Sequence, residues 1–91
     1  MLWKISQVSD IMSILSHEKR LGMLCLISEK ERNISELTDL LGISQSLTSQ
    51  FALKMRDQGI LKSRKEGKEV FYSLQETQIL ELIKALKTIY C

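Results

Sequence analysis

The chain of 91 residues has no proline, one histidine and only two cysteines. The absence of proline excludes Pro-rich linkers, so closely spaced elements are expected. No apolar run reaches the roughly 18 residues that a membrane span needs. The first residues, Met1 to Lys4, lack the layout of a signal peptide. We therefore expect a cytoplasmic protein without membrane association, whose cysteines act as thiols or a redox pair rather than a structural disulfide.

Catalytic motifs are also missing. The sequence shows no acid–base pair, no nucleophile elbow and no glycine-rich loop that would cradle a phosphate, so an enzyme is not expected. The length allows one domain, and the composition of 44% apolar and 26% charged residues supports one core. Residues 1–91 are therefore predicted to form a single domain.

Apolar residues recur at helical spacing at both ends of the chain. Residues 4–15 carry Ile5, Val8, Ile11, Met12 and Leu15. This spacing predicts an amphipathic helix, after which Ser16 is expected to cap a second helix from His17 to Glu29. The second helix is apolar on most sides, which is typical of a buried helix. The segment Thr77–Cys91 repeats apolar residues on one face and predicts a final helix.

Two further helices are predicted in the middle of the chain. Asn33 and Glu36 have the spacing of a capping box, and Gly42 suits the end of the short helix that follows. Ser44 is expected to cap a fourth helix that runs to about Gln58. Two helices joined by a short turn that contains glycine have the layout of a helix-turn-helix.

A β-hairpin is predicted after the fourth helix. Two β-prone runs, Ile60–Lys65 and Lys68–Leu74, flank the dipeptide Glu66-Gly67. The predicted fold is mainly α with a β-hairpin wing, in the order α-α-α-α-β-β-α. This is a winged helix-turn-helix.

The charge distribution favours double-stranded DNA as the partner. Residues 44–69 carry six basic and three acidic side chains, a net charge of +3, whereas the remainder carries −1. In a helix-turn-helix, the N-terminal residues of the second helix meet base edges in the major groove. The candidate DNA contacts are Ser44, Gln45, Ser46, Thr48, Ser49, Gln50 and Lys54 on this helix and Arg64, Lys65 and Lys68 on the hairpin. The alternative is a winged helix that serves as a protein-interaction module without binding DNA, and steep salt dependence of DNA binding would distinguish the two.

Several sequence blocks, in this order and spacing, resemble the ArsR-type winged-helix repressors. They are LSHEKRL at residues 15–21, ISEL at 34–37, LGISQSLTSQ at 41–50, GIL at 59–61 and VFYSL at 70–74. The resemblance covers about residues 8–91. It implies a homodimer joined by the first and last helices, and a repressor that a chemical signal releases from its operator.

The metal ligands of this family are not matched. The positions of the metal-sensing cysteines hold Ile34, Ser35 and Leu37, and the last helix has no histidine. The single histidine, His17, is expected at a helix start in a capping or surface role. We predict no metal site and no cofactor, because a site needs several converging ligands. A metal-responsive repressor remains the alternative, which a search for bound zinc would test.

The two cysteines resemble those of the sulfide and redox sensors of the same family. The resemblance implies that reactive sulfur species or oxidants join Cys25 to Cys91 and lower the affinity for DNA. The residues alone do not decide whether Cys25 and Cys91 are reactive. The apolar surroundings of Cys25 and the C-terminal position of Cys91 disfavour thiolates, whereas Lys84 and Lys87 favour one. A structural cysteine and a frayed terminal one are the alternative.

Overall fold

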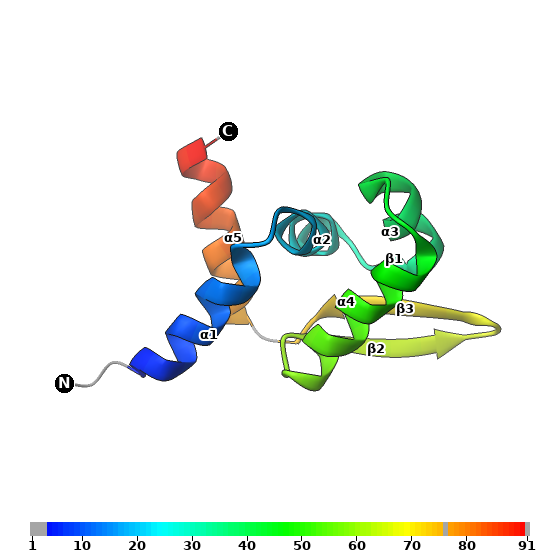
Figure 1. The fold of residues 1–91 in the computed structure, drawn as a ribbon, viewed down its shortest axis with the longest axis horizontal. Coiled ribbons are helices and arrows are strands. Elements are labelled where there is room, and N and C mark those ends of the chain that lie inside the picture. The colour runs from blue at the N-terminus through cyan, green and yellow to red at the C-terminus, as the bar shows by residue number, and fades with distance from the viewer. Residues whose placement is uncertain (1–3, 76, 91) are drawn as a thin grey trace.

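The computed structural model describes residues 4–75 and 77–90. Within these ranges the elements are α1 (Ile5–Leu15), α2 (Glu18–Glu29), β1 (Arg32–Asn33), α3 (Ile34–Leu41), α4 (Gln45–Asp57), β2 (Leu61–Glu66), β3 (Glu69–Leu74) and α5 (Thr77–Tyr90). Figure 1 shows α1 and α5 at one end of the molecule and the tip of the β2–β3 hairpin at the other. The predicted winged helix-turn-helix, with its order of helices and hairpin, is confirmed.

The strand β1 was not predicted. It pairs antiparallel with β3, with Arg32 opposite Tyr72 and Asn33 opposite Phe71, so the sheet order is β1-β3-β2. Two residues are too few to show the alternation by which a strand is recognised in a sequence. The pairing attaches the segment between α2 and α3 to the hairpin.

The boundary between α1 and α2 corrects the predicted cap. Ser16 has helical dihedral angles and its hydroxyl donates to the carbonyl of Ser13 at 2.6 Å, so it closes α1. His17 has the extended conformation that an N-cap requires, and its Nδ1 accepts from the backbone N–H of Lys19 at 3.2 Å. The histidine therefore caps α2, as its position at a helix start suggested.

The predicted caps of α3 and α4 are confirmed. The backbone N–H of Glu36 donates to Asn33 Oδ1 at 2.8 Å, and the backbone N–H of Asn33 donates to Glu36 Oε1 at 3.2 Å. Gly42, with φ of 66°, ends α3 in the left-handed region. Ser44 Oγ accepts from the N–H of Leu47 at 3.1 Å and begins α4. The local sequence therefore determines both helices of the helix-turn-helix.

The core lies around α2, which packs against α1, α3, α5 and β3. The burial predicted for α2 is confirmed by Met23, Leu24 and Ile27. The other fully buried large side chains come from four further elements and are Leu37, Thr48, Met55, Leu61 and Ile83. Among the described helices, none is long and apolar enough to cross a membrane.

The hairpin turn lies one residue later than predicted. Glu66 pairs with Glu69, so Gly67 and Lys68 form the turn, and Gly67 takes a positive φ of 62°. Because successive side chains of a strand point to opposite faces, Lys65 shares the face of buried Leu61, whereas Arg64 lies on the other face. This alternation separates the two basic residues near the tip of the hairpin.

Candidate nucleic-acid interface

The helix α4 presents a polar face to solvent. Its inward side is occupied by Thr48, Ala52 and Met55. The predicted contact residues Gln45, Ser46, Gln50 and Lys54 are exposed, and Ser49 is half-buried. Amide and hydroxyl groups both donate and accept hydrogen bonds, which suits the edges of bases.

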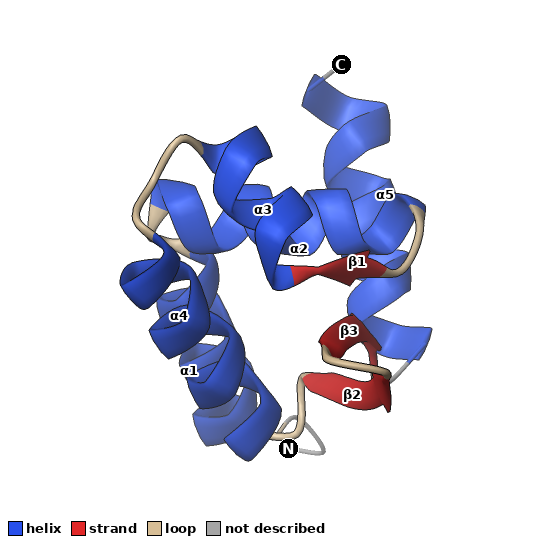
Figure 2. Cartoon of the chain, turned by 90° about the vertical axis from the view of Figure 1, so that its right-hand side faces the viewer, coloured by secondary structure: helices blue, strands red, loops and turns tan. Residues whose placement is uncertain are grey.

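A shallow groove of about 280 Å³ lies between α4, the start of α3 and the hairpin. It is lined by Asn33, Ile34, Ser35, Gln45, Ser49, Lys68, Glu69 and Val70. Gln45 and Ser49 were predicted as DNA contacts on the fourth helix, and Lys68 was predicted as one on the hairpin. The fold brings all three to one groove. In Figure 2, α3, α4 and the hairpin can be followed around this region.

The start of α4 adds a partial positive charge to this face. The first N–H groups of a helix and its dipole favour a nearby anion such as a phosphate. Ser44, a predicted contact, is exposed, but its Oγ already accepts the N–H of Leu47. Its observed contact is therefore the cap that begins the helix.

One predicted contact residue is corrected by its burial. Thr48 has no exposed surface, so its side chain cannot touch DNA. Its hydroxyl donates to the carbonyl of Ser44 at 2.8 Å and accepts from Thr38 Oγ1 at 3.0 Å. The prediction failed because a polar residue at the start of α4 was taken to face outward, whereas this one joins α4 to α3.

A second contact holds α3 against the helix before it. Lys19 Nζ, from the first turn of α2, donates to the carbonyl of Leu41 at 3.1 Å. This carbonyl lies in the last turn of α3, where backbone acceptors lack partners within the helix. The lysine therefore fixes the end of α3 just before the turn into α4.

The hairpin carries the second group of predicted contacts. Lys65 and Lys68 are exposed, and no hydrogen bond or ion pair with another described residue engages either ammonium group. Lys65 lies opposite Val70, which lines the groove. Both ammonium groups are therefore accessible to an anion beside α4.

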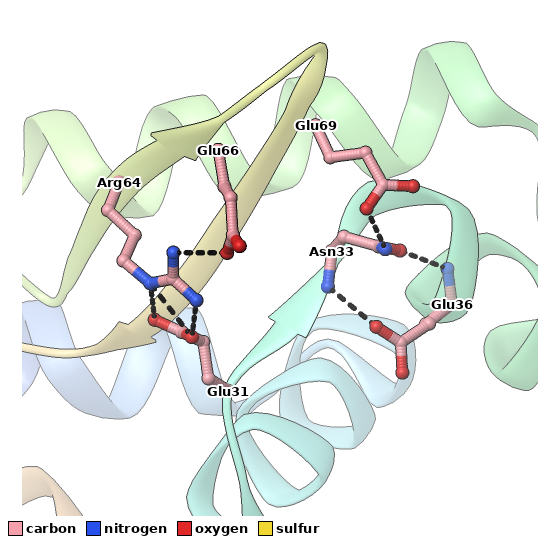
Figure 3. Close-up of polar contacts among 6 residues, drawn as sticks. All are labelled: Glu31, Asn33, Glu36, Arg64, Glu66 and Glu69. Carbon is pink, nitrogen blue, oxygen red and sulfur yellow. Dashed lines mark hydrogen bonds and ion pairs between the residues drawn. The ribbon is translucent and has the colours of Figure 1, made fainter.

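Arg64 differs from these lysines because its guanidinium is engaged within the protein (Figure 3). Nε lies 3.0 and 2.9 Å from the two carboxylate oxygens of Glu31, and Nη2 lies 2.7 Å from Oε1. Nη1 donates to Glu66 at 2.7 Å. The hydrogen bonds from Arg64 hold the pKa of the Glu31 carboxyl below its usual range, and those of Glu31 and Glu66 raise the pKa of Arg64.

Glu69 provides another contact between the hairpin and the segment around β1 (Figure 3). Asn33 Nδ2 donates to Glu69 Oε2 at 3.3 Å while Asn33 Oδ1 caps α3. The sequence identified Asn33 as a cap. It gave no signal that Glu31 would bind Arg64 or that Glu69 would bind Asn33, because the two partners are separated by 33 and 36 positions in the chain.

The predicted redox residues are only partly described by the structure. Cys25 is half-buried on α2 and packs against the core. Cys91 lies outside the described residues. Among residues 4–75 and 77–90, no three histidine, cysteine or acidic side chains are grouped so that they could hold a metal ion.

The comparisons identify the family. Residues 17–63 match the family described as bacterial regulatory protein, arsR family. The chain is 35% identical to the biofilm growth-associated repressor of Xylella fastidiosa strain Temecula1 over 97% of this chain and 77% of that protein. Both of these matches include the helix-turn-helix.

Solved structures agree with this match. HlyU from Vibrio cholerae N16961 superposes with a TM-score of 0.92 at 32% identity, covering 100% of this chain and 99% of that one. Its reduced form gives a TM-score of 0.89 at 32% identity, with 94% and 90% covered. The winged helix-turn-helix domain Mb0332 from Mycobacterium bovis shares the fold at 20% identity, with a TM-score of 0.81 and 93% and 79% covered. The chain therefore belongs to the ArsR family of winged helix-turn-helix transcriptional regulators.

Proposed function

We propose that the protein is a homodimeric transcriptional regulator that binds double-stranded operator DNA in the cytoplasm. The groove that joins Gln45 and Ser49 of α4 to Lys68 of the hairpin carries this proposal. The N-terminal half of α4 would enter the major groove. Lys65 and Lys68 would lie against the phosphate backbone, where cations strengthen binding by releasing counterions.

The dimer is supported by an apolar seam on α1. Ile5, Val8 and Met12 lie on one face of this helix and are 54%, 39% and 46% exposed. The opposite side of α1 buries Ile14 in the core. Large apolar side chains grouped on one exposed face are typical of an interaction site.

The end of α5 exposes further apolar surface. Ile89 and Tyr90 are 68% and 81% exposed, and α1 and α5 lie at the same end of the molecule in Figure 1. A two-fold dimer through this end would leave both α4 helices and both hairpins free. Such a dimer would suit an operator with two half-sites about one helical turn apart.

Val8→Asp tests the dimer, because it would bury a charge in the proposed interface. Sedimentation equilibrium should show a dimer for the wild type and a monomer for the variant. Ser6→Asp introduces the same charge at an exposed position away from the seam and should leave the dimer intact. A wild-type protein that stays monomeric at concentrations of tens of micromolar would exclude the proposed assembly.

DNA binding is tested with a duplex selected from a random pool by the protein itself. Fluorescence anisotropy across a salt series should give an affinity that falls steeply with salt, since phosphate contacts release counterions. A Lys65→Ala, Lys68→Ala double variant should reduce the slope by about one unit for each lost contact. Failure to enrich any duplex, or an affinity independent of salt, would favour an interaction module that does not bind DNA.

We further propose that thiol chemistry at Cys25 and Cys91 lowers the affinity for DNA. The resemblance to the two-cysteine sensors supports this switch. Cys25 lies on α2 one turn before Glu29, and Glu29 Oε1 lies 3.7 Å from Lys87 Nζ in the last turn of α5. The final helix therefore contacts the end of α2. A covalent link from Cys25 to Cys91, which follows α5 in the sequence, would constrain a helix that also carries the proposed dimer surface.

The chemistry balances with either proposed class of inducer. A hydroperoxide takes two electrons from the two thiols, and the sulfurs form a disulfide while the peroxide becomes water and an alcohol or a second water. A persulfide instead transfers its outer sulfur to one cysteine and leaves as a thiol. The second cysteine thiol then displaces hydrogen sulfide from the new persulfide and closes the same disulfide.

Reduced protein should bind the selected duplex more tightly than protein treated with hydrogen peroxide or an organic persulfide. Cys25→Ser and Cys91→Ser should each retain the affinity of the reduced protein after treatment. Intact mass should fall by about 2 Da for a disulfide, and each extra bridging sulfur adds about 32 Da. Equal losses of affinity in the wild type and both serine variants would exclude this pair as the switch.

A further inference from the structure

We propose that Arg64 is a positioning residue, which sets the angle of the wing by holding Glu31 while Lys65 and Lys68 contact DNA. The wing is the β2–β3 hairpin. The inference rests on the proposed function, because it assigns Arg64 a role in DNA binding without direct contact.

The first reason is that all three nitrogens of the Arg64 guanidinium are engaged. Nε and Nη2 hold the Glu31 carboxylate at 2.7 to 3.0 Å, and Nη1 holds Glu66 at 2.7 Å. The guanidinium carbon also lies 4.7 Å from the centroid of the Phe71 ring. A bidentate pair of this kind fixes orientation as well as distance. Three of its five N–H groups are used in these contacts, so a phosphate would have to share the guanidinium with two carboxylates.

The second reason is the alternation of side chains along β2. Lys65 lies opposite Val70 of the groove, whereas Arg64 lies opposite Phe71 on the other face of the hairpin. Neighbouring residues of a strand point to opposite faces. Val70 lines the groove beside α4, whereas neither Arg64 nor Phe71 is among its lining residues.

The third reason is the location of Glu31. It lies between the end of α2 and β1, and Asn33 of the same short segment holds Glu69 at 3.3 Å. Arg64 and Glu69 come from the two strands of the hairpin, so both strands are attached to residues 31–33. Asn33 also caps α3, and this segment therefore relates the wing to the helix-turn-helix.

A double-mutant cycle separates positioning from direct contact. Glu31→Ala removes a negative charge, so if Arg64 contacted phosphate this change would free it and raise the affinity for DNA. If Arg64 positions the wing, Glu31→Ala and Arg64→Ala should each lower the affinity for the selected duplex about threefold to tenfold through lost pre-organisation. The double variant should lose no more than Arg64→Ala alone, because the Arg64–Glu31 pair is already absent from that single variant.

Salt dependence provides the matched control. Lys65→Ala should reduce the slope of log affinity against log salt by about one unit per protomer. Arg64→Ala should leave this slope unchanged. A reduced slope in Arg64→Ala, or an increased affinity in Glu31→Ala, would overturn the positioning role while leaving DNA binding intact.

An NMR measurement decides the question without DNA. Residual dipolar couplings of the backbone amides should show that the hairpin is reoriented relative to α2 in both Arg64→Ala and Glu31→Ala. Lys65→Ala should keep the wild-type orientation. An unchanged hairpin orientation in the first two variants would overturn the proposal even if the wild type bound no DNA.

Discussion

Thr38 and Thr48 join the two helices of the helix-turn-helix by a hydrogen bond between their hydroxyl groups, 3.0 Å long. Thr48 is completely buried, and its hydroxyl also donates a hydrogen bond of 2.8 Å to the carbonyl of Ser44. A polar contact between a buried and a half-buried threonine therefore helps to position α4 relative to α3. Breaking such a contact has a cost, because the buried Thr48 hydroxyl has no access to water as a replacement partner.

Thr48→Val preserves the shape of the side chain and removes its hydroxyl. It should lower the free energy of unfolding by about 0.5 to 1.5 kcal/mol, since the hydrogen bonds of Thr48 with Ser44 and with half-buried Thr38 are lost. Urea denaturation followed by circular dichroism measures this loss. Ser46→Ala, at an exposed position of the same helix turn, should change stability by less than about 0.5 kcal/mol. Equal stability of Thr48→Val and the wild type would show that the hydroxyl pair contributes nothing.

Asn33→Ala should destabilise the protein through α3. It removes the acceptor for the N–H of Glu36 and the donor to Glu69, and the loss of an N-cap costs about 1 to 2 kcal/mol. Thermal and urea unfolding would measure the effect. Ser35→Ala is the control, because Ser35 is exposed in the first turn of the same helix. A loss for the control as large as that for Asn33→Ala would contradict the capping role.

Gly42→Ala isolates the backbone conformation at the turn of the helix-turn-helix. A Cβ at Gly42 would have no heavy atom within 4 Å, so any cost arises from the φ of 66°. A left-handed conformation costs a residue with a Cβ about 1 to 2 kcal/mol. Gly42→Asn should cost less, since asparagine tolerates this conformation better. Chemical denaturation that ranked alanine above asparagine in stability would contradict this explanation.

Glu31 should titrate below its ordinary pKa of 4.5, chiefly because Arg64 donates hydrogen bonds to its carboxylate. The charges of Arg64 and Lys62 lower the pKa further, whereas desolvation opposes the shift, and Glu66 shares the same guanidinium. Since the pKa is lower in the folded state, the pair stabilises the protein above pH 4.5. This stabilisation is lost as the pH falls through the lowered value. Side-chain carboxyl NMR should show the low pKa in the wild type and a return toward 4.5 in Arg64→Ala; the same pKa in both proteins would contradict the assignment.

Features encoded by neighbouring residues were predictable from the sequence. The capping box of Asn33 and Glu36, the cap at Ser44 and the glycine that ends α3 all depend on residues within one helical turn. Ser16 was misassigned because serine also closes a helix by bonding back to the carbonyl of Ser13. Both serine and histidine can cap, and only the backbone conformation distinguishes them.

Features that depend on pairing across the fold were not predictable. The hairpin was predicted from its two β-prone runs, but only the pairing of β1 with β3 and of β3 with β2 brings Glu31 to Arg64. Polarity alone likewise placed Thr48 among the outward residues of α4, whereas its partner Thr38 lies on another helix. Thr48 is the predicted contact that burial excludes. The candidates that remain on α4 and its cap are Ser44, Gln45, Ser46, Ser49, Gln50 and Lys54, and those on the wing are Lys65 and Lys68, with Arg64 proposed to position them.

The most direct measurement of the central claim is the ratio of affinities for the selected duplex and a scrambled duplex of equal length. For wild-type protein in 0.15 M salt, this ratio should be about a thousand or more, as for specific DNA readers. A Gln45→Ala, Gln50→Ala double variant should reduce the ratio by at least about tenfold while its affinity for the scrambled duplex stays the same. A ratio unchanged by the double variant would contradict the claim that α4 reads the operator.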